Sequence, residues 1–258
     1  MPFTRRIAGA LDDPGLLTLI DFYKCYRAYV RGKVSSIKSL EPEVPEAERQ
    51  ASREKAGKFF QLALSYAIAG SEPMVLAVTG RVGAGKSSLA KMIGQMLGAE
   101  VFSSDRTRKE LAGVEPHLRV DATARASLYS EAMTERTYET AIGRAIEAAC
   151  AHGVAILDAT FGKSEQRKML RERLAAAGMQ HRFIELNASD PEIIQRLSDR
   201  EQGKTEVSDA RLQDFEMLSA AYERPDVGED GPHVIIESDP SVEATATKTL
   251  CALVRLNL

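Results

Sequence analysis

Two patterns of apolar residues alternate along most of the chain: short continuous runs, and longer stretches in which apolar positions recur every three or four residues. The short runs are rich in β-branched residues and are typical of buried strands. They cover residues 74–79, 100–103, 154–158, 182–186 and 233–237. The longer stretches between them have the period of helices. Because parallel strands are joined by crossover helices, we predict an α/β fold, a five-stranded parallel sheet with helices on both faces.

The predicted helices of this region follow the strands closely. They span residues 88–97, 124–151, 164–177, 208–222 and 242–256, and a further one begins at Asp190. Ser164 is the expected capping residue of its helix. Asp190 is expected to cap the helix that has Pro191 at its first position.

Residues 1–70 lack the strand pattern and are predicted to form a helical extension before a domain that spans residues 73–258. Residues 1–15 are expected to be a poorly ordered lead-in, followed by helices over 16–30 and 47–69. The first of these helices carries an apolar stripe formed by Leu16, Leu19, Ile20, Tyr23, Tyr26 and Val30. A helix that is apolar on most of its surface is normally covered. We therefore expect the sheet domain, a second copy of the chain or another protein to cover it.

The clearest chemical motif lies between the first predicted strand and the helix that follows it. Residues 80–87 match the pattern G-x-x-x-x-G-K-S of a P-loop. Its glycines let successive backbone N–H groups point at phosphate oxygens, and the positive end of the helix points to the same place. Lys86 would then contact the β- and γ-phosphates, and the Ser87 hydroxyl would bind Mg²⁺. The expected nucleotide-binding residues are Gly80, Arg81, Val82, Gly83, Ala84, Gly85, Lys86, Ser87 and Ser88.

A glycine-rich turn that precedes a helix by chance is the alternative. The strand, the motif and the helix occur in the order that phosphate binding requires, so we favour the P-loop.

Asp158 ends the buried run of residues 154–158. In a P-loop fold this strand lies beside the first one, so the carboxylate would point at the metal ion and hold Mg²⁺. A helix cap or a turn is the alternative role for such an aspartate. Thr160 can face the same crevice, where ligands of parallel sheets bind.

Asp105 follows the second predicted strand within the sequence Ser103-Ser104-Asp105. A carboxylate at this place can accept the proton of a hydroxyl that attacks the γ-phosphate. An equally good interpretation is that Asp105 caps a helix beginning near Arg106. Arg108 can pair with an anionic substrate, or with surface carboxylates.

Arg196 and Arg200 are four residues apart and therefore share one helix face, next to a polar loop that contains a glycine. In a phosphoryl transferase, a mobile lid at such a place brings cations to the phosphates and stabilises the transition state. The pattern alone slightly favours a solvated, charged helix end.

The overall composition restricts the partners and the compartment. The formal net charge is −3, which provides no general attraction to nucleic acid or anionic membranes. The three cysteines, Cys25, Cys150 and Cys251, are far apart, which favours a reducing compartment and a cytoplasmic protein. No apolar run approaches the roughly 20 residues of a membrane span, so no membrane contact is expected.

Taken together, these motifs resemble the P-loop kinases of the zeta-toxin and polynucleotide-kinase-like group. Within it they are most similar to the kinases fused behind aminoglycoside-phosphotransferase-like domains. The residues that carry the resemblance are Gly80–Ser87, Ser103–Asp105, Arg108, Asp158–Phe161, Arg196, Arg200 and Ser208–Ala210. The resemblance implies that Asp105 is the base for a substrate hydroxyl and that Arg200 contacts the ATP phosphates. Residues 21–34 are similar to the last helices of the phosphotransferase-like domain, whose H-x-D-x-x-x-x-N catalytic loop this chain lacks.

The sequence thus predicts an ATP- and Mg²⁺-dependent phosphotransferase that acts on a hydroxyl of a small-molecule or nucleotide-like acceptor. A polynucleotide 5′-hydroxyl kinase is an alternative, although the negative charge and the absence of Trp speak against a nucleic-acid channel. A second alternative is an NTPase switch regulated by a partner that binds the N-terminal helices. No motif distinguishes ATP from GTP or names the acceptor.

Overall fold

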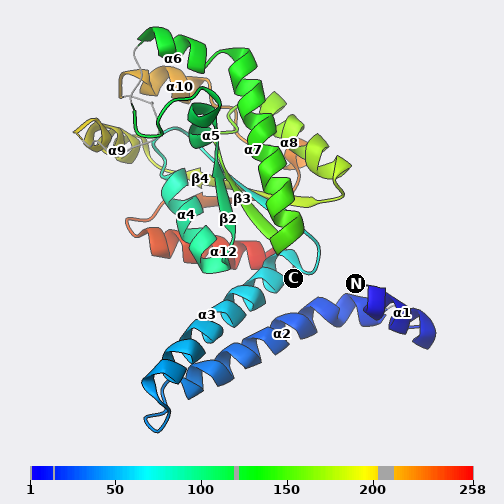
Figure 1. Cartoon of the computed structure of the whole chain (residues 1–258). Coiled ribbons are helices and arrows are strands. Elements are labelled where there is room, and N and C mark those ends of the chain that lie inside the picture. Colours follow the sequence, from blue (N-terminus) through cyan, green and yellow to red (C-terminus); the bar gives the residue numbers. More distant parts are fainter. Residues whose placement is uncertain (1, 14, 119–121, 203–211, 258) are drawn as a thin grey trace. The chain divides into compact units, whose positions relative to one another are not determined.

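The chain forms two compact units in the computed structural model. The first contains the N-terminal helices through Glu72, and the second begins at Pro73 and contains the sheet (Figure 1). The structure describes residues 2–13, 15–118, 122–202 and 212–257. Within these ranges no helix is both long and apolar enough to span a membrane.

A five-stranded parallel sheet forms the centre of the second unit. Its strands are β1 (Met74–Thr79), β2 (Glu100–Ser103), β3 (Val154–Asp158), β4 (Gln180–Asn187) and β5 (His233–Glu237). They lie in the order β2-β3-β1-β4-β5, and all adjacent pairs are parallel. The predicted α/β fold is confirmed, and β4 is slightly longer at both ends than expected. β1 is buried along its whole length because it is the central strand.

Helices follow the strands of this unit. They are α4 (Lys86–Leu97), α5 (Ser104–Leu111), α6 (Ala122–Leu128), α7 (Glu131–His152), α8 (Ser164–Ala176), α9 (Asp190–Gln202), a 3₁₀ turn (Leu212–Asp214), α10 (Phe215–Ala220), α11 (Val227–Asp230) and α12 (Val242–Arg255). On one face of the sheet, α7 and α8 form an apolar core with Ala77, Leu157 and Phe183. On the opposite face, Gly94 of α4 lies against Ile156. α12 packs against β5 (Figure 1).

Several helix ends differ from the expected ones. The helix expected over 124–151 is two helices, because Ser130 caps α7 by accepting a hydrogen bond from the Met133 amide. At α9 the amide of Ser189 donates to the Glu192 carboxylate (2.9 Å), so Ser189 occupies the N-cap position and Asp190 is the first helical residue. The N-cap residue of α8 is Lys163 and not Ser164, and the Lys163 side chain makes no capping hydrogen bond.

Part of one expected helix lies outside the described residues. Of the stretch 208–222, the start with Ser208 is not described, and the described part is the 3₁₀ turn followed by the short α10.

The first unit is helical from its start. Its helices are α1 (Pro2–Leu11), α2 (Gly15–Lys38) and α3 (Glu46–Ala69). Over Pro2–Leu11 the expected poorly ordered lead-in is instead a helix. α2 and α3 form a helical hairpin (Figure 1). Asp21 of α2 links the two helices at the end away from the connecting loop, by accepting a hydrogen bond from the amide of Ser71, which follows α3 (3.1 Å).

Small residues dominate the contact face of this hairpin. The buried positions along most of the two helices are Ala28, Gly32, Ser52, Ala56 and Ala63, and Ile68 and Ala69 are buried at the end of α3. A Cβ atom on Gly32 would lie 2.7 Å from the Phe60 ring, which shows how closely α2 approaches α3. Tyr23 and Tyr26 are consequently more than half exposed, at 56% and 58%.

Candidate active site

The P-loop connects the end of β1 to the start of α4. Gly80, Gly83 and Gly85 have φ angles of 140°, 81° and 102°, a region that favours glycine. A Cβ atom on Gly80 would lie only 2.4 Å from the Leu186 carbonyl oxygen, so a larger residue does not fit there. α4 begins directly after this loop at Lys86, and its first backbone N–H groups have no partner inside the helix. The loop therefore has the local geometry of an anion cradle.

Two cationic side chains of the loop have protein partners. Lys86 Nζ donates to the Arg81 carbonyl oxygen (2.9 Å), so the side chain curls back over the loop. The Arg81 guanidinium forms an ion pair with Asp190 (2.6 Å) and donates to the Ala188 carbonyl oxygen (2.7 Å). The side chain of Arg81 thus ties the P-loop to the segment between β4 and α9.

Asp158 lies at the end of β3, next to Val78 of β1 and Ser103 of β2. Asp158 is only 6% exposed. Burial raises the pKa of Asp158, while hydrogen bonds from Ser87 and Ser103 and the nearby Lys86 charge counteract part of this effect. The ionised carboxylate is therefore short of compensating positive charge.

The donor set fits Mg²⁺. The Asp158 carboxylate and the Ser87 hydroxyl are hard oxygen ligands, and Mg²⁺ usually takes only one or two protein ligands beside waters and substrate phosphates. No group of three or more His, Cys, Asp or Glu in the described ranges can hold a metal. A magnesium ion here would be held jointly by these two residues and by a nucleotide.

Asp105 lines the same cleft as Asp158. It is in the first turn of α5, which starts at Ser104, so the N-cap position belongs to Ser103 and not to Asp105. A small cleft of about 40 Å³ is lined by residues that include Lys86, Ser87, Asp105, Asp158 and Thr160. The structure thus brings together residues predicted from three separate parts of the sequence.

A larger cavity of about 1170 Å³ adjoins this cleft. Val82, Ser104, Asp105 and Thr160 line both hollows. Its walls come from α5, α6, the start of α7, the turn after β3, and α10. Asp105 and Thr160 therefore lie where a space next to the phosphate cradle opens into a space large enough for a small molecule.

Arg108 belongs to the wall of the large cavity. It is 5% exposed, and its guanidinium donates to the Leu128 carbonyl oxygen and to the Thr134 hydroxyl, both at 3.0 Å. It also stacks on the Tyr129 ring at 4.6 Å from the centroid. These contacts join α5 to α6 and α7, and a contact of Arg108 with substrate stays a prediction.

The two arginines expected to act on the phosphates lie on α9. Arg196 donates to the Ala84 carbonyl oxygen in the P-loop (2.7 Å) and to the Ser238 hydroxyl (2.8 Å). The structure therefore places Arg196 at the cradle. Arg200 is in the last part of the same helix, but its side chain lies outside the described residues, as does the whole stretch Ser208–Ala210.

Two tyrosines near the cavity were not recognised from the sequence as site residues. The Tyr138 hydroxyl accepts a hydrogen bond from the Phe161 amide (3.2 Å), and burial raises the pKa of Tyr138 to about 12. Tyr222 lies 3.4 Å from the Thr79 hydroxyl, and burial raises its pKa to about 12 as well. In the sequence Tyr138 is only one of the apolar positions of a predicted helix. The sequence therefore contains no signal that its hydroxyl binds the Phe161 amide.

The sheet order, the P-loop after the central strand and the carboxylate that ends β3 define a P-loop kinase-like fold. Residues 75–225 match the AAA domain family, and the chain belongs to this family.

Relatives in two mycobacteria match part of the chain. The uncharacterized proteins Rv2004c of Mycobacterium tuberculosis and Mb2027c of Mycobacterium bovis are each 33% identical over 168 residues. The match covers 64% of this chain and 31% of each relative, so the chain spans about a third of the length of these proteins.

Solved structures of other proteins, two of them kinases by name, share the fold. APS kinase CysC of Mycobacterium tuberculosis, in complex with AMPPNP and APS, has a TM-score of 0.51 and 20% identity, covering 71% of this chain and 98% of its own. Kti12 of Chaetomium thermophilum, in complex with ADP-AlF3, has a TM-score of 0.53 and 17% identity over 71% and 99%. Shikimate kinase of Acinetobacter baumannii has a TM-score of 0.51 and 16% identity over 75% and 99%. At these identities the likeness concerns the fold alone.

We predict that Asp158→Asn stabilises the nucleotide-free protein at neutral pH. Because the pKa of Asp158 is raised on folding, its contribution to stability is complete below the unfolded pKa and is lost as the pH rises through the folded pKa. Asn has no charge to desolvate. The melting temperature of the Asp158→Asn variant should therefore exceed that of the wild type by a few degrees at pH 8, and this difference should shrink towards pH 5.

Differential scanning calorimetry between pH 5 and pH 8, without nucleotide or magnesium, measures this difference. Asp199→Asn on the exposed surface of α9 is the matched control and should show no such trend. A difference for Asp158→Asn that stays constant with pH, or that has the opposite sign, would contradict the electrostatic explanation.

Proposed function

We propose that the chain is an ATP- and Mg²⁺-dependent kinase that transfers the γ-phosphate to a hydroxyl group of a small molecule. The observation that carries this proposal is the placement of two carboxylates around one cleft at the P-loop. Asp158 is on the metal side of this cleft, and Asp105 is on the side that opens into the large cavity. A pure phosphate-binding protein has no need of the second carboxylate, whereas a kinase needs a base for its acceptor.

In the proposed reaction, the P-loop amides and Lys86 bind the β- and γ-phosphates, and Lys86 Nζ exchanges its bond to the Arg81 carbonyl for phosphate oxygens. Ser87 and Asp158 would hold the magnesium ion, which neutralises part of the phosphate charge. Asp105 accepts the proton of the acceptor hydroxyl while the acceptor oxygen forms a bond to the γ-phosphorus. The bond between this phosphorus and the β–γ bridging oxygen breaks, and ADP leaves.

Arg196 and Arg200 are proposed to neutralise charge that develops on the phosphates. The contact of Arg196 with the Ala84 carbonyl supports its part in this proposal, because it places the guanidinium beside the cradle. For Arg200 the support is its position on the same helix, about one turn further on.

The charges of the large cavity indicate the class of acceptor. Arg125 forms an ion pair with Asp214. Arg108 uses its Nη1 atom for two hydrogen bonds to wall groups, while its buried Nε atom has no partner in the described part of the chain. Lys163 adds one positive charge to the lining. The carboxylates Glu131, Glu135 and Glu165 also line the cavity, and no ion pair or hydrogen bond engages them within the described part of the chain. A neutral or amine-bearing hydroxyl compound therefore fits better than a phosphorylated or carboxylated one.

The same charges disfavour a polynucleotide 5′-hydroxyl acceptor, since the phosphates of an oligonucleotide would approach unpaired carboxylates. The second candidate function is a nucleotide-dependent switch. It is favoured by the exposed aromatic residues of α2, among them Phe22 and Tyr26, which could bind a protein partner or a second copy of the chain. Slow ATP hydrolysis that depends on such a partner, and not on an acceptor, would support the switch.

An ADP-release assay with matched acceptors tests the proposed acceptor class. Glucose, glucosamine, gluconate and glucose 6-phosphate present similar hydroxyls with different charges, and nucleosides and a 5′-hydroxyl oligonucleotide complete the panel. We expect acceptor-dependent ADP release to be higher with glucose or glucosamine than with gluconate or glucose 6-phosphate. A difference of about 1.4 kcal/mol from repulsion by the cavity carboxylates corresponds to about tenfold. Higher turnover with the anionic members would overturn the assignment of the acceptor class.

The roles of Lys86 and Asp105 can be separated by measuring turnover and nucleotide affinity in parallel. Asp105→Asn should reduce turnover by about 10²–10⁴-fold, because it removes the base, while the affinity for ADP stays within about twofold. Lys86→Ala should reduce turnover at least as strongly and should also weaken nucleotide binding, since it removes a phosphate contact. Titration with a fluorescent ADP analogue gives the affinity. Full turnover of Asp105→Asn would eliminate the base assignment.

A further inference from the structure

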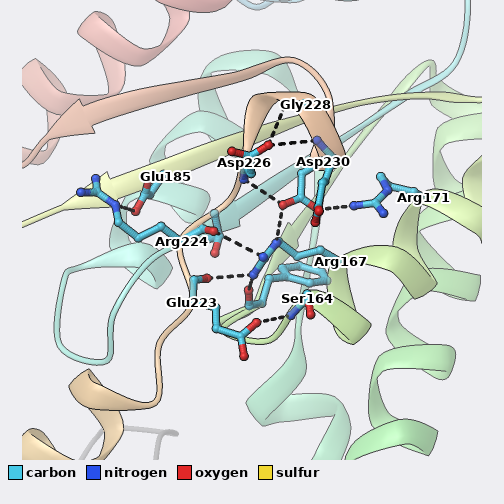
Figure 2. A network of polar contacts seen from close by, with 12 residues as sticks. Ser164, Arg167, Arg171, Glu185, Glu223, Arg224, Asp226, Gly228 and Asp230 are labelled. Atoms are coloured by element: carbon cyan, nitrogen blue, oxygen red, sulfur yellow. Dashed lines mark hydrogen bonds and ion pairs between the residues drawn. The ribbon is translucent and has the colours of Figure 1, made fainter.

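A buried arginine on α8 connects three separate segments of the second unit. Arg167 is 3% exposed. Its Nη1 atom donates to the carbonyl oxygens of Phe161 (2.9 Å) and Glu223 (2.8 Å). Its Nη2 atom donates to the Arg224 carbonyl oxygen (3.3 Å), and its Nε atom donates to Asp230 (2.7 Å). Figure 2 shows this guanidinium at the centre of the network.

The carboxylate of Asp230 holds the guanidinium in this orientation. Asp230 is 1% exposed, and its two oxygens pair with Arg167 and with Arg171 on the next turn of α8. The Asp226 amide also donates to it (3.0 Å), and the Asp226 side chain in turn caps the short α11 (Figure 2). A buried ion pair is rigid only when its remaining donors and acceptors are satisfied, and these contacts satisfy them.

The first segment held by Arg167 is the turn after β3. Phe161 has a φ angle of 45°, which is unusual for a bulky residue. Its amide donates to the Tyr138 hydroxyl and its carbonyl accepts from Arg167, so side chains hold both backbone groups in place. The Phe161 ring packs edge-on against Tyr138 and Phe183, with centroids 5.1 Å and 5.9 Å away. The unusual backbone conformation of Phe161 is therefore stabilised by two hydrogen bonds and by the packing of its ring.

The second segment follows α10 and lies beside this turn. The Glu223 amide donates to the Gly162 carbonyl oxygen (2.9 Å), and the Ser164 amide donates to the Glu223 carboxylate (2.8 Å). Thr160, Gly162 and Lys163 from the turn, and Ala221 and Tyr222 from the second segment, line the large cavity. Arg167 lies behind both segments and is not among the described lining residues.

We propose that Arg167 is a positioning residue for the phosphoryl acceptor. By bonding the carbonyls of Phe161, Glu223 and Arg224 with one planar group, it sets the spacing between two walls of the acceptor cavity and thereby the position of the acceptor hydroxyl relative to Asp105. This inference rests on the proposed kinase function and adds a residue outside the cleft that tunes acceptor binding.

Arg167→Lys is the test variant, because lysine keeps the charge beside Asp230 but cannot donate to three carbonyls from one planar group. Arg171→Lys is the matched control, since Arg171 pairs with the same carboxylate and its side chain makes no hydrogen bond to either cavity wall within the described residues. Both variants keep the net charge of the network.

The kinetic readout is the KM for the acceptor compared with the KM for ATP. Glucosamine is the acceptor probe, replaced by glucose if glucose gives the higher wild-type turnover. In Arg167→Lys we expect kcat/KM for the acceptor to fall by about 10- to 100-fold, mainly through KM, while the KM for ATP stays within about twofold. Arg171→Lys should stay near the wild type. A lower melting temperature with an unchanged acceptor KM, or equal effects in both variants, would show a merely structural role and overturn the proposal.

Hydrogen exchange gives a readout that needs no acceptor. In Arg167→Lys, peptides covering residues 159–164 and 221–226 should both exchange faster, while a peptide covering the P-loop exchanges as in the wild type. If no acceptor is phosphorylated by the wild type, the proposed function fails, but these peptides still decide whether Arg167 holds the two walls. Unchanged exchange in both peptides would overturn the proposal whatever the kinetics show.

Discussion

The site depends on one buried negative charge. Asp158 ends the strand next to the P-loop strand, in surroundings that raise its pKa, and its compensating groups are two hydroxyls and the nearby charge of Lys86. In such surroundings an ionised carboxylate is costly unless positive charge approaches it. The cleft offers room for that charge between Asp158, Ser87 and the cradle. An anion cradle beside an undercompensated carboxylate suits a ligand that carries both signs, such as a magnesium–nucleotide complex.

The end of β3 supplies residues to both hollows of the site, the phosphate cleft and the large cavity. Side chains alternate along β3, so Leu157 and Ala159 point into the core under α7 and α8, while Asp158 between them points to the side of the P-loop. The chain turns at Phe161, three residues after Asp158, and residues on both sides of this turn line the large cavity. The end of a single strand thus serves the phosphate cleft on one side and the acceptor cavity on the other.

Local patterns sufficed for the sheet and for the cradle. Strands that are buried on both faces are continuous apolar runs, and the P-loop needs glycine at positions where a Cβ atom would clash, as at Gly80. Helix boundaries were less predictable, because the break before α7 depends on a single hydrogen bond from Met133 to Ser130. The sequence did not indicate which face of α2 contacts α3, because its aromatic residues outweigh Ala28 and Gly32 in apolar area although close helix packing selects the small ones.

Site residues were predictable where chemistry determines the residue type, and not where only tertiary contact does. Asp105, Asp158 and Lys86 follow strand ends or a motif, so their meeting at one cleft followed from the parallel topology. Arg167 lies in a helix whose neighbouring positions are charged and solvated, such as Lys168 and Glu172. Its sequence context is that of a surface residue. Its burial depends on tertiary contacts with the turn at Phe161, the segment after α10 and α11.

The choice of an ion pair at this buried place has a physical reason. An apolar side chain of similar size would avoid the desolvation of two charges, and such replacements often increase stability. It would also leave the carbonyls of Phe161, Glu223 and Arg224 without their donor, and the left-handed turn at Phe161 would lose one of its supports. The planar guanidinium directs its N–H groups at fixed angles, so the positions of these carbonyls are coupled to each other. The network therefore contributes geometry to the cavity that packing alone does not supply.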